Sequence, residues 1–243
     1  MSMVVCLCII FFGSIGVINA QEEQSDEEKS TGIPLSFGLK AGTNFHSFTD
    51  QQPHTGSKMG YSGGLFVMYS FSDAVAVQLD AAYFQQGGRY IQFVDETRFG
   101  APAEYSTKYV KDASVTLHNV FVPLQARISV SNETYLPDLL IGPYIDVNFA
   151  ATETYEKTGQ INDQYVTTIG SDVVTDQYKM FQYGATAALS FTIPTNKNLS
   201  VLFDVAYKYG VFPVKEGFSY IDLYNVSGDI NSNALSVSVG IKF

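Results

Sequence analysis

Hydrophobic and polar residues alternate along most of this chain with a period of two, the pattern of a β-strand with two different faces. Eight segments carry the pattern, and after residue 31 no window keeps the 3.6-residue period of an amphipathic helix. The segments exceed the five or six residues that are usual for a strand in a soluble protein. The expected strands lie at about 33–45, 59–71, 74–86, 115–130, 138–151, 179–193, 198–211 and 233–243.

The two faces of the expected strands differ in polarity. In the segment 198–211, Phe203 and Val205 alternate with Ser200 and Asp204. Across all segments, the polar faces carry Lys40, Asp80, Arg127, Asp146, Asp204, Lys208 and Lys242. These faces are otherwise rich in small residues and too poor in Lys and Glu for a water-exposed surface. We therefore expect them to fill a crowded lumen while the apolar faces meet lipid. A soluble lipocalin-like barrel or β-sandwich, with its apolar face inside, is the alternative.

The connections between the expected strands alternate in length. Short connections lie at 72–73, 131–137 and 194–197, and long ones lie at about 46–58, 87–114, 152–178 and 212–232. Short turns at one end and long loops at the other are typical of barrels in the bacterial outer membrane. The pattern predicts an all-β domain over 33–243, namely an eight-stranded antiparallel up-and-down transmembrane β-barrel.

The segment before this domain predicts export. Residues 1–20 are expected to form a signal peptide, because the uncharged run from Val4 to Ile18 is shorter than the about 20 residues of a spanning helix. A retained N-terminal anchor is the alternative, and the leader departs from the usual pattern in having no Lys or Arg before the apolar run. Residues 21–32 are expected to be an acidic flexible tail. Both cysteines, Cys6 and Cys8, lie in the leader, so the exported chain would form no disulfide.

Composition narrows the functional class. Charged residues make up 16% of the chain, below the roughly 25% of an ordinary soluble domain, and the formal net charge is -10. A nucleic-acid-binding protein needs a basic excess, so nucleic acid is not expected as a partner. Trp is absent, and Tyr and Phe must form the aromatic girdles of a barrel. We expect Phe71, Phe191 and Phe243 at the short-turn rim, and Phe45 and Tyr83 at the opposite rim.

Short motifs resemble those of a known family. Residues 37–45 (Phe-Gly-Leu-Lys-Ala-Gly-Thr-Asn-Phe), 119–126 (Asn-Val-Phe-Val-Pro-Leu-Gln-Ala) and 139–144 (Leu-Leu-Ile-Gly-Pro-Tyr) resemble strands of the PorT-like outer-membrane β-barrel family. The ending, 235–243, is similar to the C-terminal strand that the barrel-assembly machinery reads through a terminal aromatic residue. The resemblance implies an eight-stranded barrel of the OmpX and OmpA type in the outer membrane of a Gram-negative cell. It implies Phe243 as the assembly signal and little about activity.

An eight-stranded barrel is just wide enough to be filled by its own side chains. The seven charged residues of the polar faces comprise four bases and three acids, and this near balance favours a plugging ion-pair network over a conduction path of one sign. A narrow pore is the alternative. We expect a structural or surface-interaction role in the outer membrane, with no enzymatic activity and no cofactor.

Catalytic or metal chemistry is weakly indicated. His46, His54 and His118 all fall at the expected loop end, where they could form an exposed site, but no H-x-x-x-H or H-E-x-x-H spacing accompanies them. We interpret them as solvated loop histidines.

The long loops suggest a surface function. The loops at 152–178 and 212–232 combine acidic residues with Tyr and Phe, namely Glu153, Glu156, Asp163, Asp172, Asp176, Glu216, Asp222 and Asp229 with Tyr155, Tyr165, Phe218, Tyr220 and Tyr224. Such loops are typical of binding surfaces for an extracellular ligand or protein, and a merely hydrated acidic surface is the alternative. The expected partners are outer-membrane lipid and the barrel-assembly machinery. A soluble exported lipocalin-like binder of an apolar ligand, or a component of a secretion or uptake complex, stays open.

Overall fold

The computed structural model describes residues 35–49, 56–96, 107–129, 136–161, 164–196, 199–219 and 227–243. The predicted signal peptide and acidic tail lie outside the described residues. The elements are β1 (Leu35–Thr49), β2 (Lys58–Ser70), β3 (Val75–Glu96), β4 (Thr107–Ile128), β5 (Asp138–Ile161), β6 (Gln164–Val173), the 3-10 helix η3 (Thr175–Gln177), β7 (Phe181–Asn196), β8 (Leu199–Gly210), β9 (Lys215–Ser219) and β10 (Ser227–Lys242). No helix of the described part is long and apolar enough to cross a membrane.

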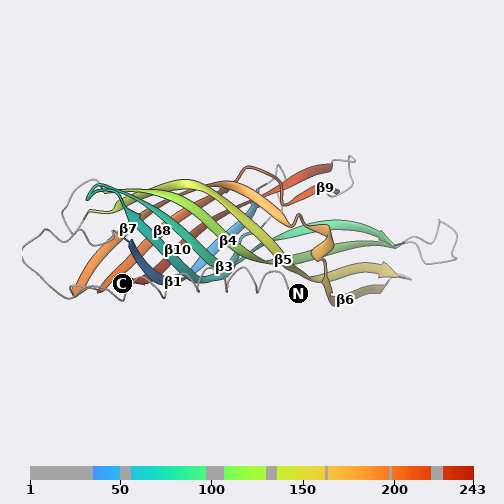
Figure 1. The fold of residues 1–243 in the computed structure, drawn as a ribbon. Coiled ribbons are helices and arrows are strands. Elements are labelled where there is room, and N and C mark those ends of the chain that lie inside the picture. Colours follow the sequence, from blue (N-terminus) through green and yellow to red (C-terminus); the bar gives the residue numbers. More distant parts are fainter. Residues whose placement is uncertain are drawn as a thin grey trace, which may run out of the picture. The chain divides into compact units, whose positions relative to one another are not determined.

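Eight of these strands close into an antiparallel ring, which confirms the predicted fold class. The order is β1-β2-β3-β4-β5-β7-β8-β10, and β10 pairs with β1 (Figure 1). At the seam, Leu39 lies opposite Ile241, and Phe243 donates a backbone hydrogen bond of 2.8 Å to the carbonyl of Phe37. The eight wall strands therefore each have a partner on both sides, as a span through lipid requires.

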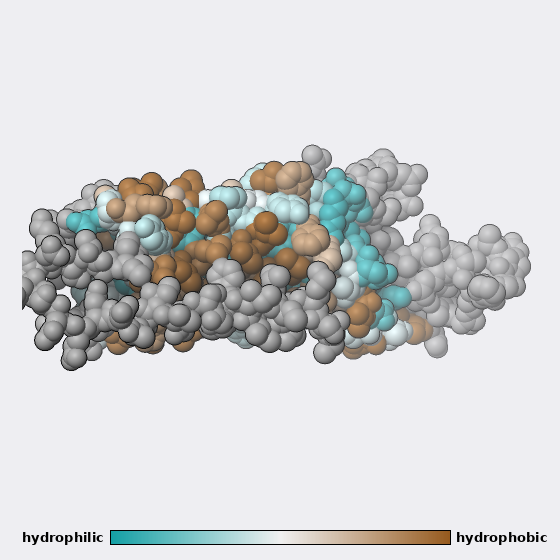
Figure 2. All heavy atoms as spheres, in the orientation of Figure 1, coloured by the Kyte–Doolittle hydropathy of each residue, from teal (hydrophilic) through white to brown (hydrophobic). Residues whose placement is uncertain are grey.

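Side chains alternate across the wall of this ring. On β8, Leu202, Asp204 and Lys208 are buried inside, whereas Phe203 and Tyr207 are exposed outside. Hydrophobic residues cover much of the wall that is visible in Figure 2, and hydrophilic ones gather beyond it, near β6 and β9. This arrangement contradicts the lipocalin-like alternative, in which the apolar faces would line the interior.

Several strands run further than the alternation predicted. The predicted loop 87–114 is largely strand, because β3 and β4 stay paired up to Glu96 and Thr107. The predicted loop 152–178 holds the second half of β5, together with β6 and η3, and the predicted loop 212–232 holds β9 and the start of β10. Beyond the lipid the outer face no longer needs to be apolar. The apolar–polar alternation is therefore lost there, while the backbone hydrogen bonding between the strands continues.

A β-bulge in β5 changes which residues point inward. His118 lies opposite Ala150 but Asn119 lies opposite Asn148, so Phe149 is the extra residue of the bulge. Asn148 is buried on one side of it, and Ala151 is buried on the other. On β5, the residues that point inward therefore have even numbers up to Asn148 and odd numbers from Ala151 onwards. The residues of β4 that point inward have odd numbers on both sides of the bulge.

The interior contains two apolar clusters. We call the end with the 71–74 turn and Phe243 the short-turn end, and the opposite end the loop end. The larger cluster, here called the apolar layer, lies at the loop end and consists of Phe48, Tyr90, Ala113, Val115, Leu117, Ala151, Val174, Tyr178, Val214 and Ile230. The smaller one consists of Phe66, Met68, Ala76 and Leu202. The polar lumen thus ends at an apolar layer that the sequence did not predict.

Candidate functional site

The middle of the lumen is organised around Lys208. Its ammonium group forms an ion pair with Asp146 and donates a hydrogen bond of 2.7 Å to Gln86 Oε1. Both ionic side chains are almost fully buried, at 3% and 0% exposure. Because an isolated buried charge is costly, each depends on the other as a partner. The ion pair joins β8 to β5, which lie on either side of β7.

A second ionic group lies one level closer to the short-turn end. Lys40 on β1 is 2.7 Å from Asp204 on β8 and 3.4 Å from Asp80 on β3. Gln78 donates a hydrogen bond of 2.7 Å to Asp80, and the Lys40 ammonium lies 4.9 Å from the centre of the Phe66 ring. The structure therefore brings together three of the seven charged residues that the alternation placed inside.

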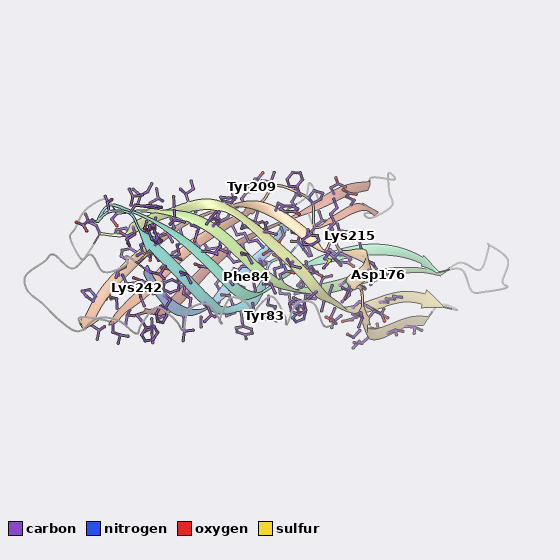
Figure 3. The ribbon with its side chains drawn as sticks, in the orientation of Figure 1. Tyr83, Phe84, Asp176, Tyr209, Lys215 and Lys242 are labelled. Atoms are coloured by element: carbon purple, nitrogen blue, oxygen red, sulfur yellow. The ribbon has the colours of Figure 1, made fainter. Side chains whose placement is uncertain are left out.

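The third ionic group is built on Arg127 near the short-turn end. Its guanidinium is 2.5 Å from Asp138 and also donates to Thr192 Oγ1 at 2.8 Å. Asp138 starts β5, and the sequence prediction had not placed it in the lumen. Lys242 lies half-buried at the same end of the molecule, and among the described residues it forms no ion pair (Figure 3).

A fourth polar group lies at the loop end, in contact with residues of the apolar layer. Glu153 is buried and accepts hydrogen bonds from the Tyr90 hydroxyl and from Lys111. Burial and the nearby Glu153 carboxylate raise the pKa of Tyr178. Burial lowers the pKa of Lys215, and the carboxylate of Glu153 opposes that shift. Side chains from β3, β4 and β9, together with Tyr178, thus surround one carboxylate of β5.

The sequence had assigned Glu153 to an exposed acidic loop, and that prediction is wrong. The bulge at Phe149 turns Glu153 inward. Tyr155, which was expected at a loop tip, lies on β5 between the ammonium groups of Lys111 and Lys157, 4.7 and 4.9 Å from its ring centre. Asp176 remains exposed, on η3, and Figure 3 shows it near Lys215. The predicted loop residues Asp163, Tyr220, Asp222 and Tyr224 lie outside the described residues.

The histidines do not form a common site. His46 is buried in the lumen, with its ring edge-on to Phe84 at a centroid distance of 5.1 Å, so it is not the solvated loop histidine that was expected. His118 lies on the outer face, and its Nδ1 is 2.6 Å from the Tyr83 hydroxyl. His54 lies outside the described residues. No cluster of His, Cys, Asp or Glu that could hold a metal occurs in the described part of the chain.

Aromatic residues lie on the outer wall near both ends. Phe71 and Phe243 are exposed at the short-turn end, and Phe45 and Tyr83 are exposed nearer the loop end. Further exposed aromatic residues accompany them towards the loop end, namely Phe149, Tyr183, Tyr209 and Phe212. With Trp absent, these rings are the aromatic side chains available to the membrane interface.

A closed antiparallel ring with charged residues inside and an apolar wall outside defines a transmembrane β-barrel. The model of the family described as "Outer membrane protein beta-barrel domain" matches residues 19–216. The chain belongs to this family and is an outer-membrane β-barrel protein.

Several solved barrel structures are similar to this chain. Neisserial surface protein A is 14% identical, with a TM-score of 0.37, and the match covers 85% of this chain and 97% of that one. Ail, the attachment invasion locus protein of Yersinia pestis, in complex with the heparin analogue sucrose octasulfate, is 13% identical, with a TM-score of 0.37 and coverage of 87% and 100%. CarO of Acinetobacter baumannii is 17% identical, with a TM-score of 0.37 and coverage of 83% and 96%. No curated protein matches.

Proposed function

We propose that this protein is a side-chain-filled barrel with a structural or surface-interaction role, which conducts no ions and catalyses no reaction. The observation that carries the proposal is the buried Lys208–Asp146 pair in the middle of the lumen. A passing ion would have to separate these two charges inside the barrel. Breaking a buried pair costs about 3–5 kcal/mol when one partner is lost.

The other interior groups support the same function. From the short-turn end, the lumen holds the Arg127–Asp138 pair, then the Lys40 group, then Lys208, and finally the apolar layer. Each level is occupied by side chains that contact one another inside the ring. An apolar layer opposes ion passage by itself, because an ion in it would lose its hydration without gaining a partner.

Recordings in a planar lipid bilayer test the closed lumen. We expect the purified, folded protein to give no stable channel, because ion pairs and the apolar layer fill the interior. The folded state is verified by heat-modifiable migration on a denaturing gel before reconstitution. Discrete, ion-selective openings from that material would overturn the closed lumen and favour the narrow pore.

Phe243 is proposed as the signal that the barrel-assembly machinery reads. Its ring is 49% exposed and lies 5.8 Å from that of Phe37, at the seam of the barrel. We expect Phe243→Ala to lower the amount of folded barrel in cells several-fold, measured by heat-modifiable migration of membrane extracts. Phe71→Ala, at another exposed aromatic residue of the same end, is the matched control and should assemble normally. Equal assembly of both variants would refute this role of Phe243.

The finer family assignment also stays a proposal. The resemblance to the PorT-like branch rests on short patterns in β1, β4 and β5. A surface role would lie at the loop end, where β6 exposes Ile169 and Val173 at 80% and 79%. Membership of a secretion or uptake complex stays a prediction, and crosslinking from residues 87–114 tests it.

A further inference from the structure

The residues around the Lys208 ammonium have the composition of a receptor for a cation. The rings of Tyr144, Phe84 and Phe121 lie 4.8, 4.9 and 5.4 Å from its Nζ. A cation within about 6 Å of an aromatic ring centre is attracted by the electrons of the ring face. The Asp146 carboxylate supplies the opposite charge, and Gln86 Oε1 accepts a hydrogen bond of 2.7 Å.

None of the residues of this receptor comes from β8, the strand that carries Lys208. Phe84, Phe121 and Tyr144 come from the neighbouring strands β3, β4 and β5, and consecutive rings are 5.0 and 5.3 Å apart. Gln86 donates its amide hydrogen to Gln182 Oε1 at 2.7 Å, which leaves its own Oε1 facing the ammonium. These contacts hold the receptor in place independently of β8.

The strand next to Tyr144 also leaves space for its ring, because Gly184 of β7 is the direct cross-strand partner of Tyr144. A Cβ atom on Gly184 of β7 would come within 2.6 Å of the Tyr144 ring and 2.1 Å of the Tyr209 carbonyl oxygen. Glycine at this position therefore lets Tyr144 lie flat against the wall, with its face turned towards the ammonium.

We infer that these residues form a binding site for a primary ammonium group, and that Lys208 occupies it in the native protein as a tethered ligand. This inference rests on the proposed function in one respect, because it assigns the Lys208 ammonium as the group that closes the middle of the lumen. Without the lysine, the Asp146 carboxylate would stay buried with an aromatic site beside it. A small alkylammonium ion then supplies the same charge, the same hydrogen bonds and the same ring contacts.

The test replaces the side chain by a free ligand. Lys208→Ala removes three methylene carbons and the nitrogen, which n-propylammonium restores. We expect the folded variant, refolded in detergent and titrated by calorimetry, to bind n-propylammonium saturably with one site. The wild-type protein should not bind it, because its own lysine fills the site. The uncharged analogue n-propanol should bind neither protein.

Second-site variants assign the binding to the receptor residues. In the Lys208→Ala background, Asp146→Asn should abolish binding, and Phe121→Leu should weaken it about fivefold through the loss of one ring. Lys242→Ala, which removes a half-buried lysine at the short-turn end, is the matched control and should gain no binding. A folded Lys208→Ala protein that does not bind n-propylammonium, or that binds n-propanol equally well, would overturn the inference.

A measurement on the wild-type protein decides the matter if Lys208→Ala does not fold. Three ring faces around one ammonium should shift the ε-methylene proton resonances of Lys208 upfield in the NMR spectrum, and Phe121→Leu should reduce that shift. An unshifted Lys208 resonance would overturn the inference. Conductance of the wild-type protein would refute only the closed lumen, so the two failures are distinguishable.

Discussion

At the scale of single residues, the lumen is held together by charges that have partners. Lys40 contacts two carboxylates, Lys208 contacts one, and Arg127 contacts Asp138. Burial strengthens these contacts, and it also makes every unpaired charge costly. Stability should therefore depend on whole ionic groups more than on any single interior residue.

Glu153 offers a direct test of this view. Glu153→Gln keeps an acceptor for the Tyr90 hydroxyl but leaves Lys111 without its carboxylate. We expect the free energy of unfolding to fall by about 1–3 kcal/mol. Urea unfolding in lipid vesicles, followed by tyrosine fluorescence, measures it. Asp176→Asn, which changes an exposed acid of η3, is the control and should stay within about 0.5 kcal/mol.

Alternation alone indicated which charged residues face inward, but it could not indicate which of them meet. Lys40, Asp80 and Asp204 lie far apart along the chain. The Lys40–Asp204 contact depends on the register of β1, β10 and β8, and the Lys40–Asp80 contact depends on that of β1, β2 and β3. Asp138 and Glu153 were not identified as lumen residues. Asp138 lies at the end of its strand, where few neighbouring residues show the apolar–polar alternation. Glu153 lies beyond the bulge, where the inward positions of β5 change from even to odd residue numbers.

At the scale of elements, the bulge in β5 connects two different interiors. On the short-turn side of the bulge, β5 contributes Asp146 and Asn148 to the polar lumen. On the loop side it contributes Ala151 to the apolar layer and Glu153 to the polar group beside that layer. The bulge therefore accommodates the extra residue Phe149 while β5 stays paired with β4 on both sides of it.

Deletion of single residues tests the role of the bulge. Without Phe149, β5 would alternate regularly, and Ala151 and Glu153 would still point inward, so we expect the barrel to fold. Without Val205 in the regular strand β8, either Asp204 or Lys208 would face lipid, at a cost of about 2–4 kcal/mol for a lysine at the membrane centre. Heat-modifiable migration reports both variants, and folding of the Val205 deletion would contradict the assigned faces.

Element type was predictable from the sequence, but element length was not. The wall strands alternate between apolar and polar residues because lipid lies on one side and the lumen on the other. Above the lipid this contrast disappears, and the prediction of β3 ended near residue 86, ten residues before Glu96. β6 exposes nearly every side chain that is described on it, so no face of it alternates.

At the scale of the whole molecule, the distribution of polarity explains the composition. Apolar residues occupy alternate positions along the wall strands, which contributes to the hydrophobic share of 46%. No long apolar helix occurs in the described part of the chain. Most of the described charges lie in the lumen or at the loop end, and Asp73 is in the 71–74 turn. Closure of the ring removes free edges from the wall, and ion pairs and the apolar layer lie inside the ring.

The inside-out arrangement of this wall can be measured directly, because the chain contains no tryptophan. Phe203 is exposed on the outer wall, and Phe66 is 1% exposed inside the lumen. We expect Phe203→Trp, folded into vesicles, to lose most of its fluorescence to brominated lipid, whereas Phe66→Trp should keep it. Strong quenching of Phe66→Trp together with an unquenched Phe203→Trp would contradict the account, because the apolar faces would then line the interior.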